Sequence, residues 1–198
     1  QGFNSLKWNF ERDRTVAVSV DSQPIKMLRY TAKKYSVAVS FGYYELCGEA
    51  IYSSYMFIGK NGEIVNNFRR VSKGWKEYDI TDEHYKEGDG FKTFTYMGKR
   101  IALAVCGDLW YEENIEQINK EKFDFLLYPV YVTYNTEMWR TKLVNEYAEQ
   151  AKKIPRPVFL VNSICDADNT RGGCYAFLNG KTVCEVPMGQ DGYLLVRV

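Results

Sequence analysis

The chain has 198 residues, of which 45% are apolar and 26% are charged, and its formal net charge at pH 7 is +1. This length predicts a single domain, residues 1–198, with one core, and this composition excludes disordered and fibrous proteins. Because acidic and basic residues are interspersed, the chain offers no basic stripe to neutralise phosphates, and we expect no nucleic-acid partner.

Membrane proteins and metalloproteins are also disfavoured. No apolar stretch approaches the roughly 20 residues of a membrane span, and residues 1–5 carry no signal pattern. We therefore expect a soluble, cytoplasmic protein with no membrane partner. The five cysteines lack paired short spacings and are interpreted as free thiols. With His84 as the one histidine and no CxxC pair, we expect no metal site.

The first half of the chain predicts a helix followed by strands. Apolar residues recur at helical spacing over residues 25–34, whereas residues 35–42 alternate small and β-branched side chains, which favours a strand. An Asn-Gly turn at residues 61–62 then joins two strand candidates, residues 52–58 and 64–68. These three segments predict a β-hairpin.

From residue 101 onward, expected strands alternate with expected helices. Residues 101–105 form a continuous apolar run, which favours a strand buried on both faces. The further expected helices are 111–122 and 137–154, and the further expected strands are 123–128 (ended by Pro129), 157–162, 175–178, 182–186 and 193–198. The pattern predicts one α/β domain with a mixed sheet or sheets, in an order that the pattern does not specify.

Cys106 is the candidate catalytic residue. It follows the apolar run directly and precedes Gly107, so it is expected at the carboxyl end of a buried strand, where open α/β sheets bind ligands. A sharp strand-to-helix turn exposes such a side chain, and the next backbone N–H can face a developing oxyanion. The alternative is a buried cysteine that only packs. His84 lies in a polar loop typical of a solvated histidine, so a carboxylate and a lysine are the more available activating groups.

Several segments together carry a resemblance to a known family. They are 51–54, 59–64, Phe68-Arg69-Arg70-Val71, Val105-Cys106-Gly107-Asp108 with its continuation to Glu113, 124–129, 161–162 and 173–174. In this order they resemble the nitrilase superfamily of carbon-nitrogen hydrolases, from about residue 25 to residue 198.

The resemblance implies an α/β fold, the αββα sandwich of the nitrilase type, and a cysteine–glutamate–lysine site without a cofactor. Cys106 is then the nucleophile that cleaves an amide or nitrile of a small molecule through a thioester, and Gly107 supplies a backbone N–H to the oxyanion. The resemblance also implies a homodimer or larger homo-oligomer, for which helix 137–154 is the candidate contact. The alternative for that helix is an ordinary surface helix.

The chain departs from the family pattern in two places. Arg70 occupies the position of the family's lysine; arginine can stabilise an oxyanion but cannot exchange a proton, so Lys73 is our preferred lysine. Glu83 resembles the family's second glutamate. The alternative for Lys73 and Glu83 is solvated loop residues. The family's first strand and base glutamate fall at or before Gln1, so the chain either is N-terminally incomplete or has lost both.

Other interpretations stay open beside the hydrolase. Asp108 is interpreted as structural, holding the turn through backbone hydrogen bonds. Tyr131, Tyr134 and Trp139 either line a pocket or only pack. The rival functions are a catalytically inactive binding or assembly protein of the same family, and a cysteine hydrolase of unrelated fold that uses His84. The sequence does not distinguish a nitrile, an amide or a carbamoyl substrate.

Overall fold

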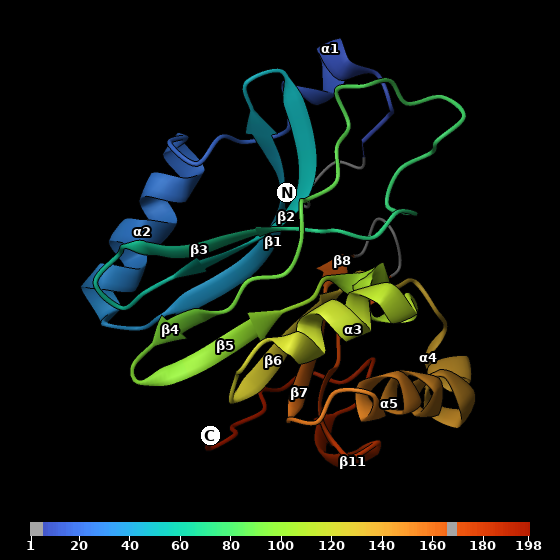
Figure 1. Cartoon of the computed structure of the whole chain (residues 1–198). Helices are drawn as coiled ribbons and strands as arrows, with labels where there is room; N and C mark the ends of the chain where they lie inside the picture. Colours follow the sequence, from blue (N-terminus) through green and yellow to red (C-terminus); the bar gives the residue numbers. More distant parts are fainter. Residues whose placement is uncertain (1–5, 166–169) are drawn as a thin grey trace. The chain divides into compact units, whose positions relative to one another are not determined.

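The computed structural model describes residues 6–165 and 170–198 (Figure 1). Residues 1–5, in which we expect no signal pattern, lie outside the described part. The chain divides into two compact units, Gln1–Gly90 and Phe91–Val198. That residues 1–198 form a single domain stays a prediction.

The first unit contains a three-stranded antiparallel sheet in the order β1-β2-β3. Its strands are β1 (Val39–Cys47), β2 (Ala50–Ile58) and β3 (Ile64–Arg69). Gly62 adopts a φ of 83° in the turn between β2 and β3, a left-handed conformation that glycine reaches without steric cost. The predicted hairpin is confirmed.

Two helices accompany this sheet. The short α1 (Phe10–Asp13) is followed by α2 (Gln23–Tyr35), which runs beside the sheet in Figure 1. The apolar face of α2 buries Ile25 and Ala32 against side chains of β1 and β2, so the predicted helix is confirmed.

The strand predicted for residues 35–42 is wrong at both ends. Tyr35 still belongs to α2, and Ser36 adopts a left-handed φ of 53° that terminates the helix. Strand β1 therefore begins at Val39, four residues after the predicted start, and it continues to Cys47. The physical reason is that β1 pairs with β2 along its whole length, and this ladder rather than local alternation sets the bounds of the strand.

The second unit is built on a six-stranded mixed sheet in the order β11-β10-β7-β6-β5-β4. Its strands are β4 (Phe94–Tyr96), β5 (Lys99–Leu103), β6 (Phe125–Val130), β7 (Val158–Asn162), β10 (Cys174–Leu178) and β11 (Lys181–Val186). The central strands β5, β6 and β7 are parallel, and the outer pairs are antiparallel. A separate two-stranded ladder joins β8 (Ile164–Cys165) and β9 (Thr170–Arg171). The predicted mixed sheet is confirmed.

The helices of the second unit pack on this sheet. They are the 3₁₀ helix η1 (Cys106–Trp110), α3 (Glu112–Lys120), α4 (Thr136–Met138), the π-helical η2 (Trp139–Leu143) and α5 (Val144–Lys152). One buried cluster joins α3 and α5 to β6 and β7, and Figure 1 draws both helices beside these strands. This cluster is the core of the unit.

The helix predicted for residues 137–154 contains a π-helical turn that periodicity did not indicate. Its buried side chains Trp139, Leu143, Tyr147 and Ala151 are spaced four residues apart. Such a stripe drifts by about 40° per step around a helix with 3.6 residues per turn. The wider turn of η2 offsets this drift over the step from Trp139 to Leu143, and all four side chains are buried.

One strand boundary differs from the prediction, and the strand predicted for residues 193–198 is wrong. Pro129 does not end its strand, because β6 continues to Val130 while its pairing with β5 stops at Leu127. At Pro129 the strand therefore has one partner only, β7, and a missing N–H on the open side is tolerated. Residues 193–198 alternate like a strand but pair with no strand among the described residues, and Tyr193 and Leu195 are exposed.

Candidate active site

Cys106 lies at a strained turn between a strand and a helix. Strand β5 ends at Leu103, and three residues later Cys106 begins η1. Cys106 has a φ of 49°, in the left-handed region that residues other than glycine rarely adopt. Such strain, about 1–3 kcal/mol, persists only where the surroundings hold the backbone, and it concentrates at functional sites. The predicted sharp turn is therefore present, with the Cys106 side chain half-buried.

Asp108 holds this turn from one side. Its fully buried carboxylate accepts a hydrogen bond from the Val105 N–H at 2.8 Å, and its own N–H donates to the Val105 carbonyl at 3.0 Å. The Asn114 side-chain amide donates to the Asp108 carbonyl at 3.2 Å, which ties the turn to α3. The interpretation of Asp108 as a structural residue is confirmed.

Tyr128 holds the turn from the other side. This fully buried residue of β6 donates its hydroxyl proton to the Cys106 carbonyl at 2.6 Å. Burial, followed by the nearby Cys106 thiol, raises the pKa of Tyr128 well above its usual 10.0, so the hydroxyl stays protonated and keeps donating. The Cys106 carbonyl and the Gly107 N–H belong to one planar peptide group. Tyr128 therefore also orients the Gly107 N–H.

We expect Tyr128→Phe to lower kcat by about tenfold with little change in KM, because the sequence predicts that the Gly107 N–H faces the oxyanion and the variant no longer holds that N–H in place. The free energy of unfolding should fall by about 1 kcal/mol through the lost hydrogen bond. Because the folded-state pKa of Tyr128 is raised, its contribution to stability is intact below about pH 10, the value of an unfolded tyrosine, and declines as pH rises further. Between pH 9 and about 11, the free energy of unfolding measured by denaturation should therefore decline less steeply in the variant than in the wild type. An unchanged kcat would contradict the role of Tyr128 in orienting Gly107.

Cys106 opens into a cavity of about 530 Å³. The cavity is lined by Cys106, Gly107, Trp110, Tyr131, Val132, Thr133, Tyr134, Glu146 and Tyr147. Tyr131 and Tyr134 thus line a pocket, as one of the two sequence interpretations has it. Trp139 does not line this cavity but lines the smaller one beside Tyr175; it is buried, its ring stacks on Tyr134 with 6.4 Å between centroids, and it also contacts Tyr147.

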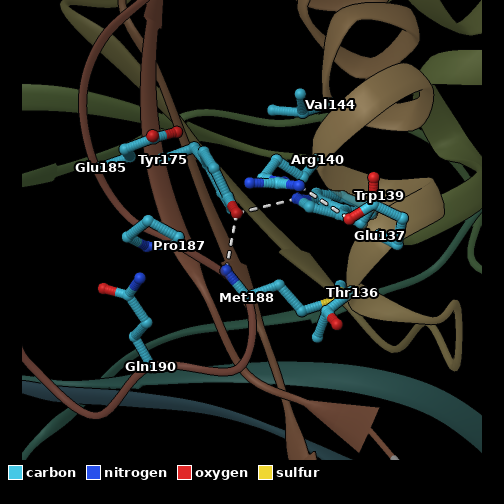
Figure 2. Close-up of a pocket in the computed structure, with 10 residues that line it drawn as sticks. All are labelled: Thr136, Glu137, Trp139, Arg140, Val144, Tyr175, Glu185, Pro187, Met188 and Gln190. Atoms are coloured by element: carbon cyan, nitrogen blue, oxygen red, sulfur yellow. Dashed lines mark hydrogen bonds and ion pairs between the residues drawn. The ribbon is translucent and has the colours of Figure 1, made fainter.

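A second cavity, of about 290 Å³, lies beside Tyr175 (Figure 2). The Tyr175 hydroxyl accepts hydrogen bonds from the Trp139 indole N–H and from the Met188 backbone N–H, each at 2.8 Å. These contacts fasten η2 to the segment that follows β11. The ten residues that line this second cavity include no cysteine, lysine or histidine, and the Glu137 carboxylate is paired with the Arg140 guanidinium at 2.7 Å. The residues around this cavity therefore have a packing role, and they offer no nucleophile for catalysis.

The remaining predicted site residues lie in the first unit. The buried Arg70 donates from Nε to the Ser72 hydroxyl at 2.8 Å and from Nη2 to the Lys73 carbonyl at 3.1 Å. The Arg70 guanidinium thus braces the loop that carries Lys73. The side chains of Lys73 and Glu83 are both exposed, and no ion pair joins them within residues 6–165 and 170–198.

His84 has local partners. Its ring stacks on Phe10 with 3.8 Å between centroids, and its Nδ1 lies 2.9 Å from the Asp82 carboxylate. Hydrogen bonding from His84 lowers the pKa of Asp82, although exposure of Asp82 to water limits the strength of the pair. These contacts give His84 a role in the local structure of its loop.

The sequence reasoning missed a cluster around Lys76. The Lys76 side chain is only 9% exposed; its ammonium lies 3.3 Å from the Glu87 carboxylate and also donates to the Tyr85 carbonyl. Tyr78 donates to the same carboxylate, and burial together with Glu87 raises the pKa of Tyr78 to about 12. Aromatic residues at positions 75 and 78 were the available signal that Lys76 has low-polarity surroundings.

All five cysteines are unpaired. Among the residues that the structure describes, no group of three or more histidine, cysteine, aspartate or glutamate side chains is placed to hold a metal ion. Over the same ranges, no helix combines the length and the apolar character needed to cross a membrane.

Comparison with known proteins gives one family match and several relatives. The carbon-nitrogen hydrolase family model matches residues 4–198. A citrullinase of Francisella tularensis is 26% identical over 120 residues, which cover 58% of this chain and 41% of that protein. A bromoxynil-specific nitrilase of Klebsiella pneumoniae is 30% identical over 107 residues, which cover 54% of this chain and 29% of that protein. The chain thus spans less than half the length of these relatives.

Solved structures show the same fold. A carbon-nitrogen hydrolase of Helicobacter pylori superposes with a TM-score of 0.69 at 15% identity, over 85% of this chain and 64% of that one. An amidase of Nesterenkonia superposes with a TM-score of 0.65 at 15% identity, over 83% of this chain and 62% of that one. The predicted α/β fold of the nitrilase type is confirmed.

Proposed function

Since this chain belongs to the carbon-nitrogen hydrolase family, we propose that it hydrolyses the carbon–nitrogen bond of a small amide or nitrile with Cys106 as the nucleophile. The observation that carries the proposal is the strained, left-handed conformation of Cys106 at the end of β5, in a cavity of about 530 Å³. A nucleophile held on such a turn faces its ligand with little reorganisation. The citrullinase and the bromoxynil-specific nitrilase among its relatives support a carbon–nitrogen substrate.

The proposed reaction on an amide has two steps. The Cys106 sulfur attacks the carbonyl carbon; a C–S bond forms, and the C=O electron pair moves to an oxyanion that the Gly107 N–H stabilises. The C–N bond then breaks, ammonia departs with the proton of the thiol, and a thioester remains. Water attacks the thioester, which releases the carboxylic acid and restores the thiol.

Residues of the first unit complete the proposal. Lys73 is the proposed cation that stabilises the oxyanion, Arg70 is the alternative donor, and Glu83 is the proposed second carboxylate. An exposed ammonium such as that of Lys73 is free to meet a substrate, whereas the Arg70 guanidinium already bonds its own loop. A homodimer or larger assembly through the helical stretch from α4 to α5, and a cytoplasmic location, stay predictions.

Alkylation with iodoacetamide, followed by mapping of the adducts, tests the nucleophile. Cys47 is exposed and Cys106 is half-buried, so accessibility alone predicts that Cys47 reacts first. An activated thiolate at Cys106 reverses this order, since the thiolate is the nucleophile. We expect Cys106 to be labelled before the other four cysteines, and a small amide to protect Cys106 while leaving Cys47 unprotected.

The opposite result would contradict the hydrolase proposal. The proposal fails if Cys47 reacts first and no amide or nitrile protects Cys106. That outcome favours the inactive binding or assembly protein, which the arginine at position 70 already suggests.

A further inference from the structure

The cavity at Cys106 has an uneven distribution of charge. Of its nine lining residues, Glu146 alone is charged, and none is a lysine, arginine or histidine. Trp110, Tyr131 and Tyr134 are exposed aromatic residues of the same lining. The face of an aromatic ring carries partial negative charge and attracts cations. The carboxylate and the aromatic rings therefore favour the same kind of ligand.

We propose that this cavity selects substrates with a second, positively charged group, such as an amine or a guanidine, and that Glu146 is the specificity-determining residue. The inference rests on the proposed function and names the substrate class of the same site. Glu146 belongs to α5 and Cys106 to η1, so the two side chains enter the cavity from different elements. One group of the substrate is held by Glu146 while its carbon–nitrogen bond is presented to Cys106.

Lys142 does not cancel this charge. Its ammonium lies 3.6 Å from the Glu146 carboxylate, and the two side chains are 72% and 43% exposed. Ion pairs of this kind on a helix surface are weak, because water and salt screen them. Lys142 does not line the cavity, so an ammonium bound inside the cavity competes with a weak external partner.

The test compares three primary amides of equal chain length: pentanamide, its terminal amine derivative and its terminal carboxylic acid derivative. We expect kcat/KM to be highest for the amine and lowest for the acid. Glu146→Gln should lower the ratio of amine to neutral amide by about three- to tenfold. Because the ratio is taken within each variant, a general loss of turnover in Glu146→Gln cancels out of the comparison. High salt should reduce the wild-type ratio and leave that of the variant unchanged.

Matched variants on the same helical stretch serve as controls. Glu149 is exposed, pairs with Lys152 at 3.3 Å and lies outside the cavity lining, so Glu149→Gln should leave the ratio unchanged. Lys142→Ala removes the competing cation and should raise the ratio. An equal effect of Glu149→Gln would mean that the general charge of the protein, rather than the cavity, sets the preference, which overturns the inference.

Three further outcomes would overturn this inference, and the first of them leaves the proposed function standing. If the neutral amide is hydrolysed and the wild type shows no preference for the amine, the charge selection is wrong while the hydrolase proposal stands. Equal loss on all three amides in Glu146→Gln would also overturn it, since Glu146 would then act in the reaction itself. Protection of Cys106 from alkylation by the same three amides measures binding without turnover, and the absence of any order among them would again overturn the selection.

Discussion

Cys106→Ala is expected to reduce hydrolysis of amides and nitriles by about 10⁴-fold or more, because the substitution deletes the atom that forms the thioester. The fold should persist. A half-buried thiol leaves only a small cavity, which costs about 1 kcal/mol or less. The turn itself is held by Asp108 and Tyr128 through backbone groups that alanine retains. Steady-state kinetics, with circular dichroism and thermal unfolding on the same preparation, measure both effects.

Cys184→Ala is the matched control. Cys184 is a half-buried cysteine of β11 that lines neither cavity described above, so its loss should leave turnover unchanged. Substantial turnover by Cys106→Ala on both classes of substrate would exclude Cys106 as the nucleophile. Loss of activity in both variants would indicate that the loss arises from the fold and not from the missing nucleophile.

Sequence reasoning succeeded where the structural signal is local. The apolar spacing of α2 and the Asn-Gly turn between β2 and β3 each lie within about a dozen residues, and both elements were predicted. Residues 193–198 alternate in the same way, but a strand also needs a partner, and no local pattern states whether one exists. Pro129 was misjudged for the same reason, since its tolerance depends on where the neighbouring β5 stops pairing.

In the candidate site, too, the local features were predicted and those that depend on tertiary packing were not. The position of Cys106 between an apolar run and a glycine is a local signal, and the turn was predicted from it. Tyr128 and Glu146 come from β6 and α5, and only the parallel order of the strands and the packing of α5 bring them to the turn and its cavity. Their contributions therefore required the structure.

Lys73→Ala is expected to cost about 2–4 kcal/mol of transition-state stabilisation, a loss of about 30- to 1,000-fold in kcat/KM, which is the range for removal of one oxyanion donor. Arg70→Ala should instead lower the free energy of unfolding by about 1–3 kcal/mol, because the buried Ser72 hydroxyl and the partly buried Lys73 carbonyl lose a hydrogen-bond donor. The folded fraction of the Arg70→Ala variant should keep most of the wild-type turnover. A lysine presents one compact charge and can exchange a proton, whereas the guanidinium is a fixed planar donor.

Two more variants decide which cation the reaction uses. Lys86→Ala removes another exposed lysine of the same unit and should have no effect on kcat/KM. Lys76→Met tests the buried ammonium that is already paired with Glu87 and with the Tyr85 carbonyl, and it should act mainly on stability because that ammonium is committed to these partners. Loss of activity in Lys76→Met with the fold intact, beside normal activity in Lys73→Ala, would transfer the role to Lys76. Activity destroyed in Arg70→Ala and retained in both lysine variants would show that the arginine itself faces the oxyanion.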